Sequence, residues 1–289
     1  IAISKRIEAG GLVGTLNEGI IAGAFSPGMP LHGQVTRGGA QLWFGETTSD
    51  HYGAFELRTA DANGQLLPIQ PGDEISVAVH GAPTDSMAMT VPPFTMEVKP
   101  ELDTVSGTAP QDAYLRIRHV SGFPPQSPVR WSWFGWDEAL QPVGSNGEFS
   151  VVWPRVVDIG PGDNIVVECV LATGHMLVLT QYQPLMNIPV LGAEVCGYGD
   201  VGSRVQVEVT GADGRAAAAR AVTGRGGVFR SDLRNVYGMQ TPVHTGDAVH
   251  SVIGDVSIDQ VVPALTAEVD WAAGHIQGTA PPLTAITIS

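Results

Sequence analysis

Residues Thr95 to Ile117 read TMEVKPELDTVSGTAPQDAYLRI, and residues Thr266 to Ile288 read TAEVDWAAGHIQGTAPPLTAITI. In both segments the glutamate, the valine after it, the Gly-Thr-Ala-Pro tetrapeptide and the final isoleucine stand at the same positions. Self-similarity over such a long segment is typical of proteins built from successive modules. The sequence therefore predicts a repeat array, an architecture that favours reach and assembly over catalysis.

Three further landmarks recur in the same order and set the length of the repeat. A Gly-x-Phe motif comes first, a Gly-Asp turn opens the next strand, and a proline closes the unit. They are Gly53-Ala54-Phe55, Gly147-Glu148-Phe149 and Gly227-Val228-Phe229; Gly72-Asp73, Gly162-Asp163 and Gly246-Asp247; and Pro93, Pro184 and Pro263. The repeat is roughly 80 to 95 residues long, which is the size of a β-sandwich domain.

Within each unit the pattern is that of β-strands. Val205, Val207 and Val209 alternate with polar residues, as in a half-buried strand. Asn-Gly and Asp-Gly pairs separate the runs, and these pairs favour tight hairpins because they tolerate positive φ. Residues 216–221 have helical propensity but stand where the other units have a strand, so we expect an edge strand or a loop there.

The order Gly-Thr-Ala-Pro, V-x-V-x-V, Gly-x-Phe, Pro-Gly-Asp-x-Ile-x-V resembles tandem bacterial Ig-like domains. The resemblance covers nearly the whole chain and implies an all-β fold of tandem Ig-like β-sandwich modules arranged as a rod. Such domains occur in secreted and surface-anchored bacterial proteins, as stalks, adhesins or fibre subunits. The resemblance therefore implies an extracellular or cell-surface location. The family shares no catalytic residues, so the resemblance implies no activity and no particular ligand.

The landmarks also place the expected module boundaries. We expect three complete modules, preceded by a closing strand or an N-terminal extension and followed by the first strands of an incomplete fourth module. The segments are 1–7, 8–93, 94–184, 185–263 and 264–289.

The two end segments are candidate assembly strands. Two strands are marginally stable by themselves in water, and an unpaired strand edge invites pairing with another chain. We therefore expect these segments to be completed either by a neighbouring copy or by the continuation of a longer repeat array. The apolar residues involved are Ile3, Ile7, Val269, Ile276, Ile286 and Ile288.

The composition excludes several classes of partner. The formal net charge is −14, and Lys5 and Lys99 are the only lysines. A nucleic-acid partner is not expected, because affinity for phosphates depends on clustered lysine and arginine. No apolar run approaches the roughly 20 residues of a membrane-spanning helix.

Motifs for catalysis are absent or lack their context, so we expect no enzyme and no cofactor. Residues 197–202 match G-x-G-x-x-G, but a strand-like run follows where a dinucleotide site needs a helix. The eight histidines show no zinc-site spacing. Asp61 and the aspartates of the Gly-Asp turns would suit a structural Ca²⁺, although aspartate in turns usually serves the backbone.

The cysteines and tryptophans are assigned from their places in the repeat. Cys169 aligns with core positions and Cys196 with outward positions, so we expect one buried thiol, one partly exposed thiol and no disulfide. Trp131 and Trp136 have no counterpart in the other units. They are therefore candidate ligand or interface residues, since exposed tryptophan stacks on sugars or is buried in protein contacts. The alternative is extra packing inside the module.

The sequence favours a non-catalytic extracellular structural protein, a subunit or segment of a surface filament, sheath or stalk. Such a protein would self-associate into a polymer or continue in a longer array. One alternative is an adhesin or carbohydrate-binding segment that recognises a glycan or a surface protein. Another is the accessory region of a larger secreted hydrolase.

Overall fold

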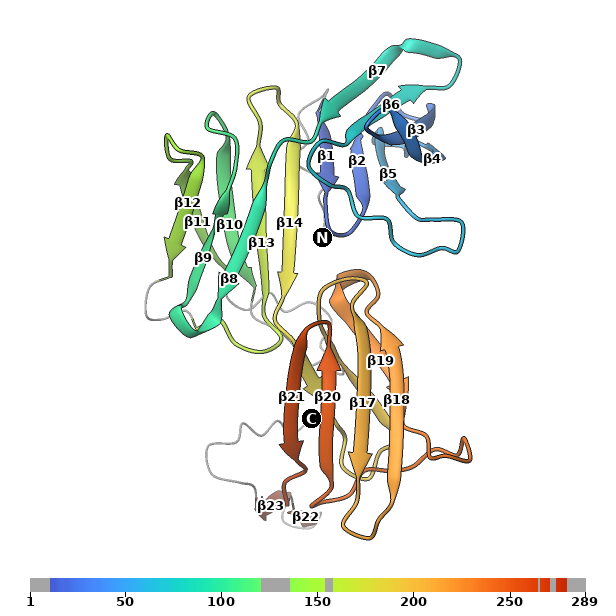
Figure 1. The fold of residues 1–289 in the computed structure, drawn as a ribbon, viewed down its shortest axis with the longest axis vertical. Helices are drawn as coiled ribbons and strands as arrows, with labels where there is room; N and C mark the ends of the chain where they lie inside the picture. The colour runs from blue at the N-terminus through green and yellow to red at the C-terminus, as the bar shows by residue number, and fades with distance from the viewer. Residues whose placement is uncertain (1–10, 121–135, 154–157, 265, 271–273, 280–289) are drawn as a thin grey trace. The chain divides into compact units, whose positions relative to one another are not determined.

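The computed structural model describes residues 11–120, 136–153, 158–264, 266–270 and 274–279. This part of the chain is all-β, as the sequence predicts, and it contains no α-helix (Figure 1). Its only helical turns are of the 3-10 type, η2 (Pro100–Leu102) and η3 (Arg225–Gly227).

Seven strands, termed here the first module, form a three-stranded group in the order β1-β2-β5 and a four-stranded sheet in the order β4-β3-β6-β7. Their bounds are β1 (Leu12–Thr15), β2 (Ile20–Ala24), β3 (Pro30–Arg37), β4 (Ala40–Thr48), β5 (Ala54–Arg58), β6 (Glu74–Val79) and β7 (Ala82–Thr90).

The second module repeats this topology, with the orders β8-β9-β12 and β11-β10-β13-β14. Its strands are β8 (Thr95–Lys99), β9 (Thr104–Thr108), β10 (Tyr114–Val120), β11 (Trp136–Pro142), β12 (Glu148–Val152), β13 (Asn164–Val170) and β14 (Met176–Tyr182). The same strand order in both modules is the structural counterpart of the recurring landmarks.

The third module has the orders β15-β16-β19 and β18-β17-β20-β21. Its strands are β15 (Leu185–Asn187), β16 (Glu194–Tyr198), β17 (Arg204–Thr210), β18 (Ala216–Val222), β19 (Val228–Asp232), β20 (Ala248–Ile253) and β21 (Val256–Val261). A separate hairpin of β22 (Thr266–Asp270) and β23 (His275–Thr279) follows.

The described chain divides into two compact units, one with strands β1–β14 and one with strands β15–β23. In the first unit a single apolar core contains residues of both modules, among them Ile75, Phe94 and Ile165. The third module has its own core, which includes Val205, Val207 and Val209.

Strand β18 shows how packing outweighs local propensity. Its alanines have the highest helix propensity, yet β18 is the edge strand of its sheet, paired with β17. Ala217 and Ala219 are buried, while Ala216 and Ala218 are exposed. The strand therefore supplies small buried side chains to the sheet. Of the two predicted alternatives, an edge strand or a loop, the structure has the edge strand.

The phenylalanine of each Gly-x-Phe motif is a buried core residue, as predicted. Phe55, Phe149 and Phe229 are all less than a tenth exposed. Each is paired across the sheet with a glycine of the second strand of its module. Those glycines are Gly23, Gly107 and Gly197. A Cβ on any of them would lie within 3 Å of the phenylalanine ring, so the ring needs a bare backbone opposite it.

The prediction of a partly exposed thiol at Cys196 is wrong. Both cysteines lie in the described part of the chain, are buried, and are not joined by a disulfide. Cys196 is on the central strand of its sheet, directly between Asn187 and Arg230 and two residues before Tyr198. Same-face neighbours with longer side chains cover a small thiol, which explains burial at an outward position.

Candidate functional site

Most of the predicted assembly and ligand residues lie outside the described residues, namely Ile3, Ile7, Trp131, Ile286 and Ile288. The backbone of Trp136 is paired with that of Val120 at the start of β11. Val269 and Ile276 are direct partners in the β22–β23 hairpin. Whether these residues bind a ligand or another copy stays a prediction.

The β22–β23 hairpin reproduces the register of the β8–β9 hairpin that opens the second module. The hydroxyl oxygens of Thr266 and Thr279 lie 2.7 Å apart, and those of Thr95 and Thr108 lie 2.8 Å apart. In each hairpin the second threonine also donates its backbone N–H to the first threonine hydroxyl. The segment after the third module therefore begins in the same way as a complete module.

The first two modules are joined through strands β1 and β14. These strands pair in parallel, with Val13, Gly14 and Thr15 opposite Met176, Leu177 and Val178. The pairing merges β1-β2-β5 with β11-β10-β13-β14 into a sheet of seven strands. We call this pairing the module joint. Its partners are more than 160 residues apart in the chain.

Polar side chains complete both ends of the module joint. At one end the Leu12 N–H donates a hydrogen bond of 3.0 Å to Nδ1 of His175. At the other end the Asn17 amide donates to the carbonyl of Thr180 and accepts from the Thr180 N–H. The side chain of Asn17 thus extends the backbone ladder by one further step, so the joint is anchored beyond its three strand pairs.

The module joint is also apolar on the sheet face away from the main core. Val13 and Ala22 of the first module form a buried cluster there with Val166 and Val178 of the second module. Burial on both faces is what parallel strands normally require. The joint is therefore a packed interface between modules and not a flexible linker.

The joint was not predicted, because no local pattern in the sequence indicates which strands of different modules pair. One signal distinguishes β1 from the opening strands β8 and β22, although the third module's opening strand β15, LMN, is uncharged as well. The sequence of β1, LVGT, carries no charge, whereas β8 carries Glu97 and Lys99 and β22 carries Glu268 and Asp270. Charged residues on an edge strand discourage pairing with a further strand.

A buried carboxylate stabilises the Gly-Asp turn of every module. Asp73, Asp163 and Asp247 are each less than a tenth exposed. Each accepts, at 2.8 Å, the backbone N–H of the residue three positions earlier. The same aspartates pair with a basic side chain from another strand or turn. The pairs are Arg37–Asp73, His119–Asp163 and Arg215–Asp247.

In the first module, the ion pair between Arg37 and Asp73 shifts the pKa of both side chains. Burial alone would raise the pKa of Asp73, but hydrogen bonds from Arg37 and from the Gln70 N–H, with the charge of Arg37, outweigh it and lower that pKa. The pKa of Arg37 is raised, chiefly by its hydrogen bond to Asp73. Both side chains therefore stay ionised, and Asp73 stabilises the Gly-Asp turn through its hydrogen bond from the Gln70 N–H.

The described residues that the sequence offers for metal or dinucleotide binding lie in or beside turns. Among them, no group of three or more His, Cys, Asp or Glu side chains is arranged to hold a metal ion. Oδ1 of Asp61 accepts the N–H groups of Asn63 and Gln65 and so shapes its own turn. A structural Ca²⁺ stays a prediction. Residues 199–203 form the turn between β16 and β17, as expected for the glycine-rich motif.

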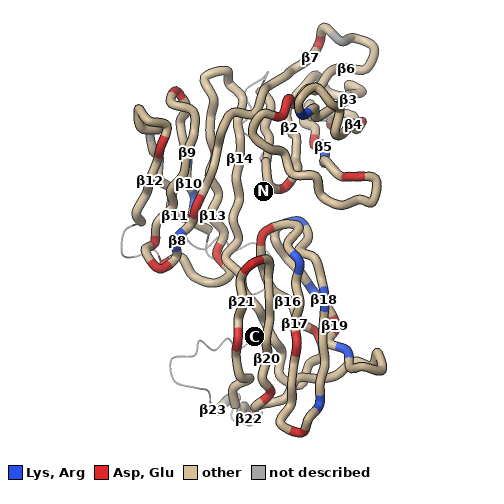
Figure 2. Tube along the Cα trace, viewed as in Figure 1, with Lys and Arg blue, Asp and Glu red and all other residues tan. Residues whose placement is uncertain are grey.

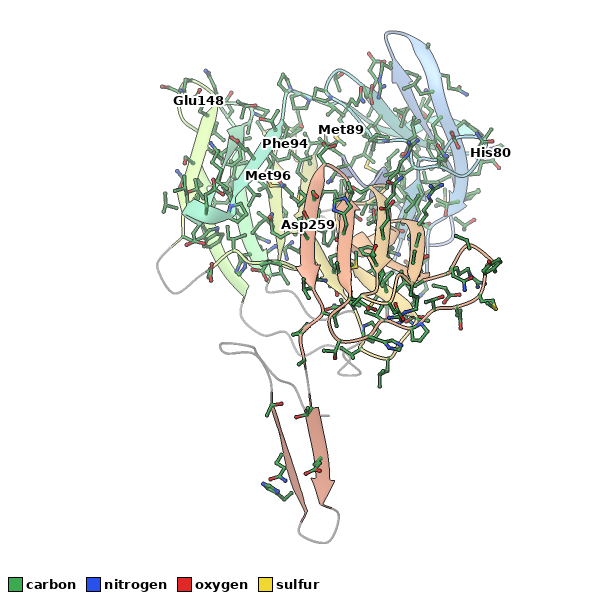
Figure 3. All side chains as sticks on the ribbon, turned by 60° about the horizontal axis from the view of Figure 1, so that its bottom comes forward. His80, Met89, Phe94, Met96, Glu148 and Asp259 are labelled. Atoms are coloured by element: carbon green, nitrogen blue, oxygen red, sulfur yellow. The ribbon has the colours of Figure 1, made fainter. Side chains whose placement is uncertain are left out.

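An apolar groove lies beside the module joint in the first unit. The end of β7, the turn before β10 and the turn between β13 and β14 surround a cavity of about 440 Å³. Its apolar lining residues are Ala88, Met89, Pro92, Pro110, Ala113, Leu171 and Ala172, and the remaining lining residues, which include Asp112 and His175, are polar. Met89 is labelled in Figure 3. We call this cavity the joint groove; its volume lies in the lower part of the range for small ligand sites.

Figure 2 marks the charged residues along the backbone of both units, with several arginines on strands and turns of the third module. Several arginines contact carboxylates, such as Arg116 and Arg118, which both bind Glu168. The described residues also contain no helix long and apolar enough to cross a membrane.

No protein-family model matches the chain, and no curated protein matches it in sequence. Among solved structures, it is similar to the tetra-tandem repeat in the extending region of a large adhesion protein, with 13% identity, a TM-score of 0.22 and coverage of 94% of this chain and 87% of that one. A BSP domain of a biofilm associated protein matches at 11% identity and a TM-score of 0.22, with coverage of 90% and 68%.

The dimeric latent PorU from Porphyromonas gingivalis matches at 10% identity and a TM-score of 0.20, with coverage of 89% of this chain and 32% of that chain. At such TM-scores these likenesses carry no argument about the fold or the function. Both therefore rest on the repeated topology and the contacts described above.

Proposed function

We propose that this chain is a non-catalytic structural segment of an extracellular or cell-surface protein, in which tandem modules form a spacer or the body of a filament. The module joint is the observation that carries the proposal. Neighbouring domains normally move relative to one another unless a large apolar interface joins them. A shared seven-stranded sheet and a shared core remove that freedom between the first two modules.

The distribution of repeated contacts supports the same role. The glycine–phenylalanine pairs and the buried turn aspartates recur in all three modules, and both serve folding. Repetition of core and turn contacts is expected when each module is selected to fold and to stack. A rod-like arrangement of the whole array stays a prediction.

Sedimentation velocity and negative-stain electron microscopy of the full chain test this proposal. We expect polymers that grow with concentration, or stiff particles whose first two modules move as one body. A glycan array and a panel of polysaccharide and peptide substrates provide the contrasting readouts. A monomer that binds one glycan tightly would favour the adhesin alternative, and turnover of any substrate would overturn the structural role.

A further inference from the structure

The turn between β19 and β20 displays three apolar side chains to solvent. Val236, Tyr237 and Met239 are 86%, 82% and 59% exposed. We call them the apolar tip. Clustered apolar side chains at the surface mark contact sites more often than isolated ones do, because their burial returns about 25 cal/mol per Å².

The apolar tip is held on a turn that several hydrogen bonds close. Oδ1 of Asn235 accepts the N–H groups of Tyr237 and Met239 at 3.0 and 3.1 Å. The guanidinium of Arg234 donates to the Gly238 carbonyl at 2.9 Å and to Asp232 at 2.8 Å. A rigid turn loses little conformational freedom when its tip is buried in a partner.

The first module contains the same turn with a polar tip. There Oδ1 of Asp61 accepts two backbone N–H groups with the same spacing, both at 2.8 Å. The glycine that follows has φ of 75° at Gly64 and 78° at Gly238. The residues at the tip positions of the first module are Ala62, Asn63 and Gln65. The backbone of this turn therefore does not require apolar side chains, and their presence in the third module needs another cause.

We propose that the apolar tip of one copy docks into the joint groove of a second copy of this chain. The groove is lined mainly by alanine, proline, leucine and methionine, so it offers the apolar surroundings that the tip lacks. Tyr237 is the largest side chain of the tip, and a tyrosine buries about 150–250 Å² when it is covered.

Because the tip and the groove lie on different modules, the contact can add one copy of the chain after another. The tip belongs to the third module and the groove to the first two, so each docked copy retains one unfilled partner site. Such a heterologous contact extends into a filament unless its geometry closes a ring. The docking rests on the proposed structural role and supplies a contact for it. Three side chains cover less than the roughly 800 Å² per partner of a stable interface, so association is weak and depends on concentration.

A transplanted tip tests the docking. The triple variant Val236→Ala, Tyr237→Asn, Met239→Gln places the tip residues of the first module on the same turn, and the variant is therefore expected to fold. Sedimentation velocity over a concentration series should show self-association at least about tenfold weaker than for the parent chain. The matched control is Tyr52→Asn, because Tyr52 is 80% exposed on a different turn. The control should associate like the parent.

Cross-linking provides the second measurement. One tagged copy carries Tyr237→Cys and the other carries Thr173→Cys, at an exposed position of the groove. Mixing them under oxidation should yield a disulfide between the two tags, since both natural cysteines are buried. Unchanged association of the triple variant, or no mixed disulfide, overturns the docking while the proposed function stands.

Two further outcomes are decisive. A parent chain that stays monomeric throughout the concentration series overturns the docking and the filament role together. Binding of the tip to neutral lipid vesicles, lost in the triple variant while self-association persists, assigns the tip to a membrane and also overturns the docking.

Discussion

The ring of Phe149 lies against the backbone of Gly107, its direct partner on the neighbouring strand. A Cβ on Gly107 would lie 2.9 Å from two atoms of that ring and would clash with the Thr95 carbonyl oxygen. The same relationship joins the glycine and the phenylalanine of the other two modules. The glycine on the second strand of each module thus leaves the space that the phenylalanine ring of the Gly-x-Phe motif fills.

Gly107→Ala should destabilise the first unit by about 1–3 kcal/mol, the usual range for overpacking, because backbone on one side and a ring on the other leave no room for a methyl group. Chemical denaturation monitored by circular dichroism measures the loss. Gly224→Ala is the control, since the nearest atom to its added Cβ is 3.6 Å away. Equal effects of the two substitutions would contradict the close packing of Phe149.

Phe229→Ala should cost about 3–5 kcal/mol in the second unit, which is usual for truncating a buried phenylalanine. Phe55→Ala and Phe149→Ala should have similar effects in the first unit, because all three rings occupy equivalent core positions. Urea unfolding of each variant provides the measurement. A loss below about 1 kcal/mol at all three positions would show that the repeat alignment, which assigns these rings to equivalent core positions, is wrong.

Asp73 should make the first unit sensitive to acid. Its pKa in the folded protein is lowered, so its contribution is present above the unfolded-state pKa, near 3.9, and disappears as the pH falls through the lower folded pKa. Asp73→Asn should therefore reduce stability at pH 7 and flatten its dependence on pH in the acid range. Urea midpoints across that range test this, with the exposed Asp259→Asn as control.

Asn17→Ala should loosen the module joint. The substitution removes both hydrogen bonds to Thr180 and should cost about 1–3 kcal/mol, because the backbone groups it leaves are partly buried. Amide hydrogen exchange should accelerate at Leu16, which donates to the Val178 carbonyl, but not at Ile165 in the middle of the second module. Unchanged exchange at Leu16 would mean that the backbone pairs hold the joint without Asn17.

Neither cysteine should react with a thiol reagent in the folded protein. Burial raises the pKa of Cys169 to about 12, which leaves almost no thiolate at neutral pH, and Cys196 is fully covered. Two thiols should become reactive after denaturation. Rapid labelling of one thiol in the native state would instead support the exposed position that the repeat alignment assigns to Cys196.

Contacts within one module could be predicted from the sequence. The burial of Phe55, Phe149 and Phe229 follows from their recurrence before a Gly-Asp turn, and the alternation around Val207 indicates a half-buried strand. These features depend on neighbours close in sequence and on the two-residue period of a strand, so a linear pattern carries them. The repeat also assigns β18 correctly against its helical propensity.

Other properties depend on residues far apart in the chain. Cys196 is buried because its neighbours on β15 and β19 are longer than it is, which no pattern along one strand contains. The tip of the third module is apolar in the sequence, but only the matching turn of the first module shows that the backbone of this turn does not require apolar side chains.

The repeat in the sequence is enough to establish an all-β chain of similar modules, because turns and alternation act through local geometry. The pairing of Val13 with Met176 is different. Any opening strand has the backbone groups to pair with any closing strand, and the choice depends on the packing of side chains brought together from distant parts of the chain. The tertiary structure alone therefore decided that the first two modules share one sheet.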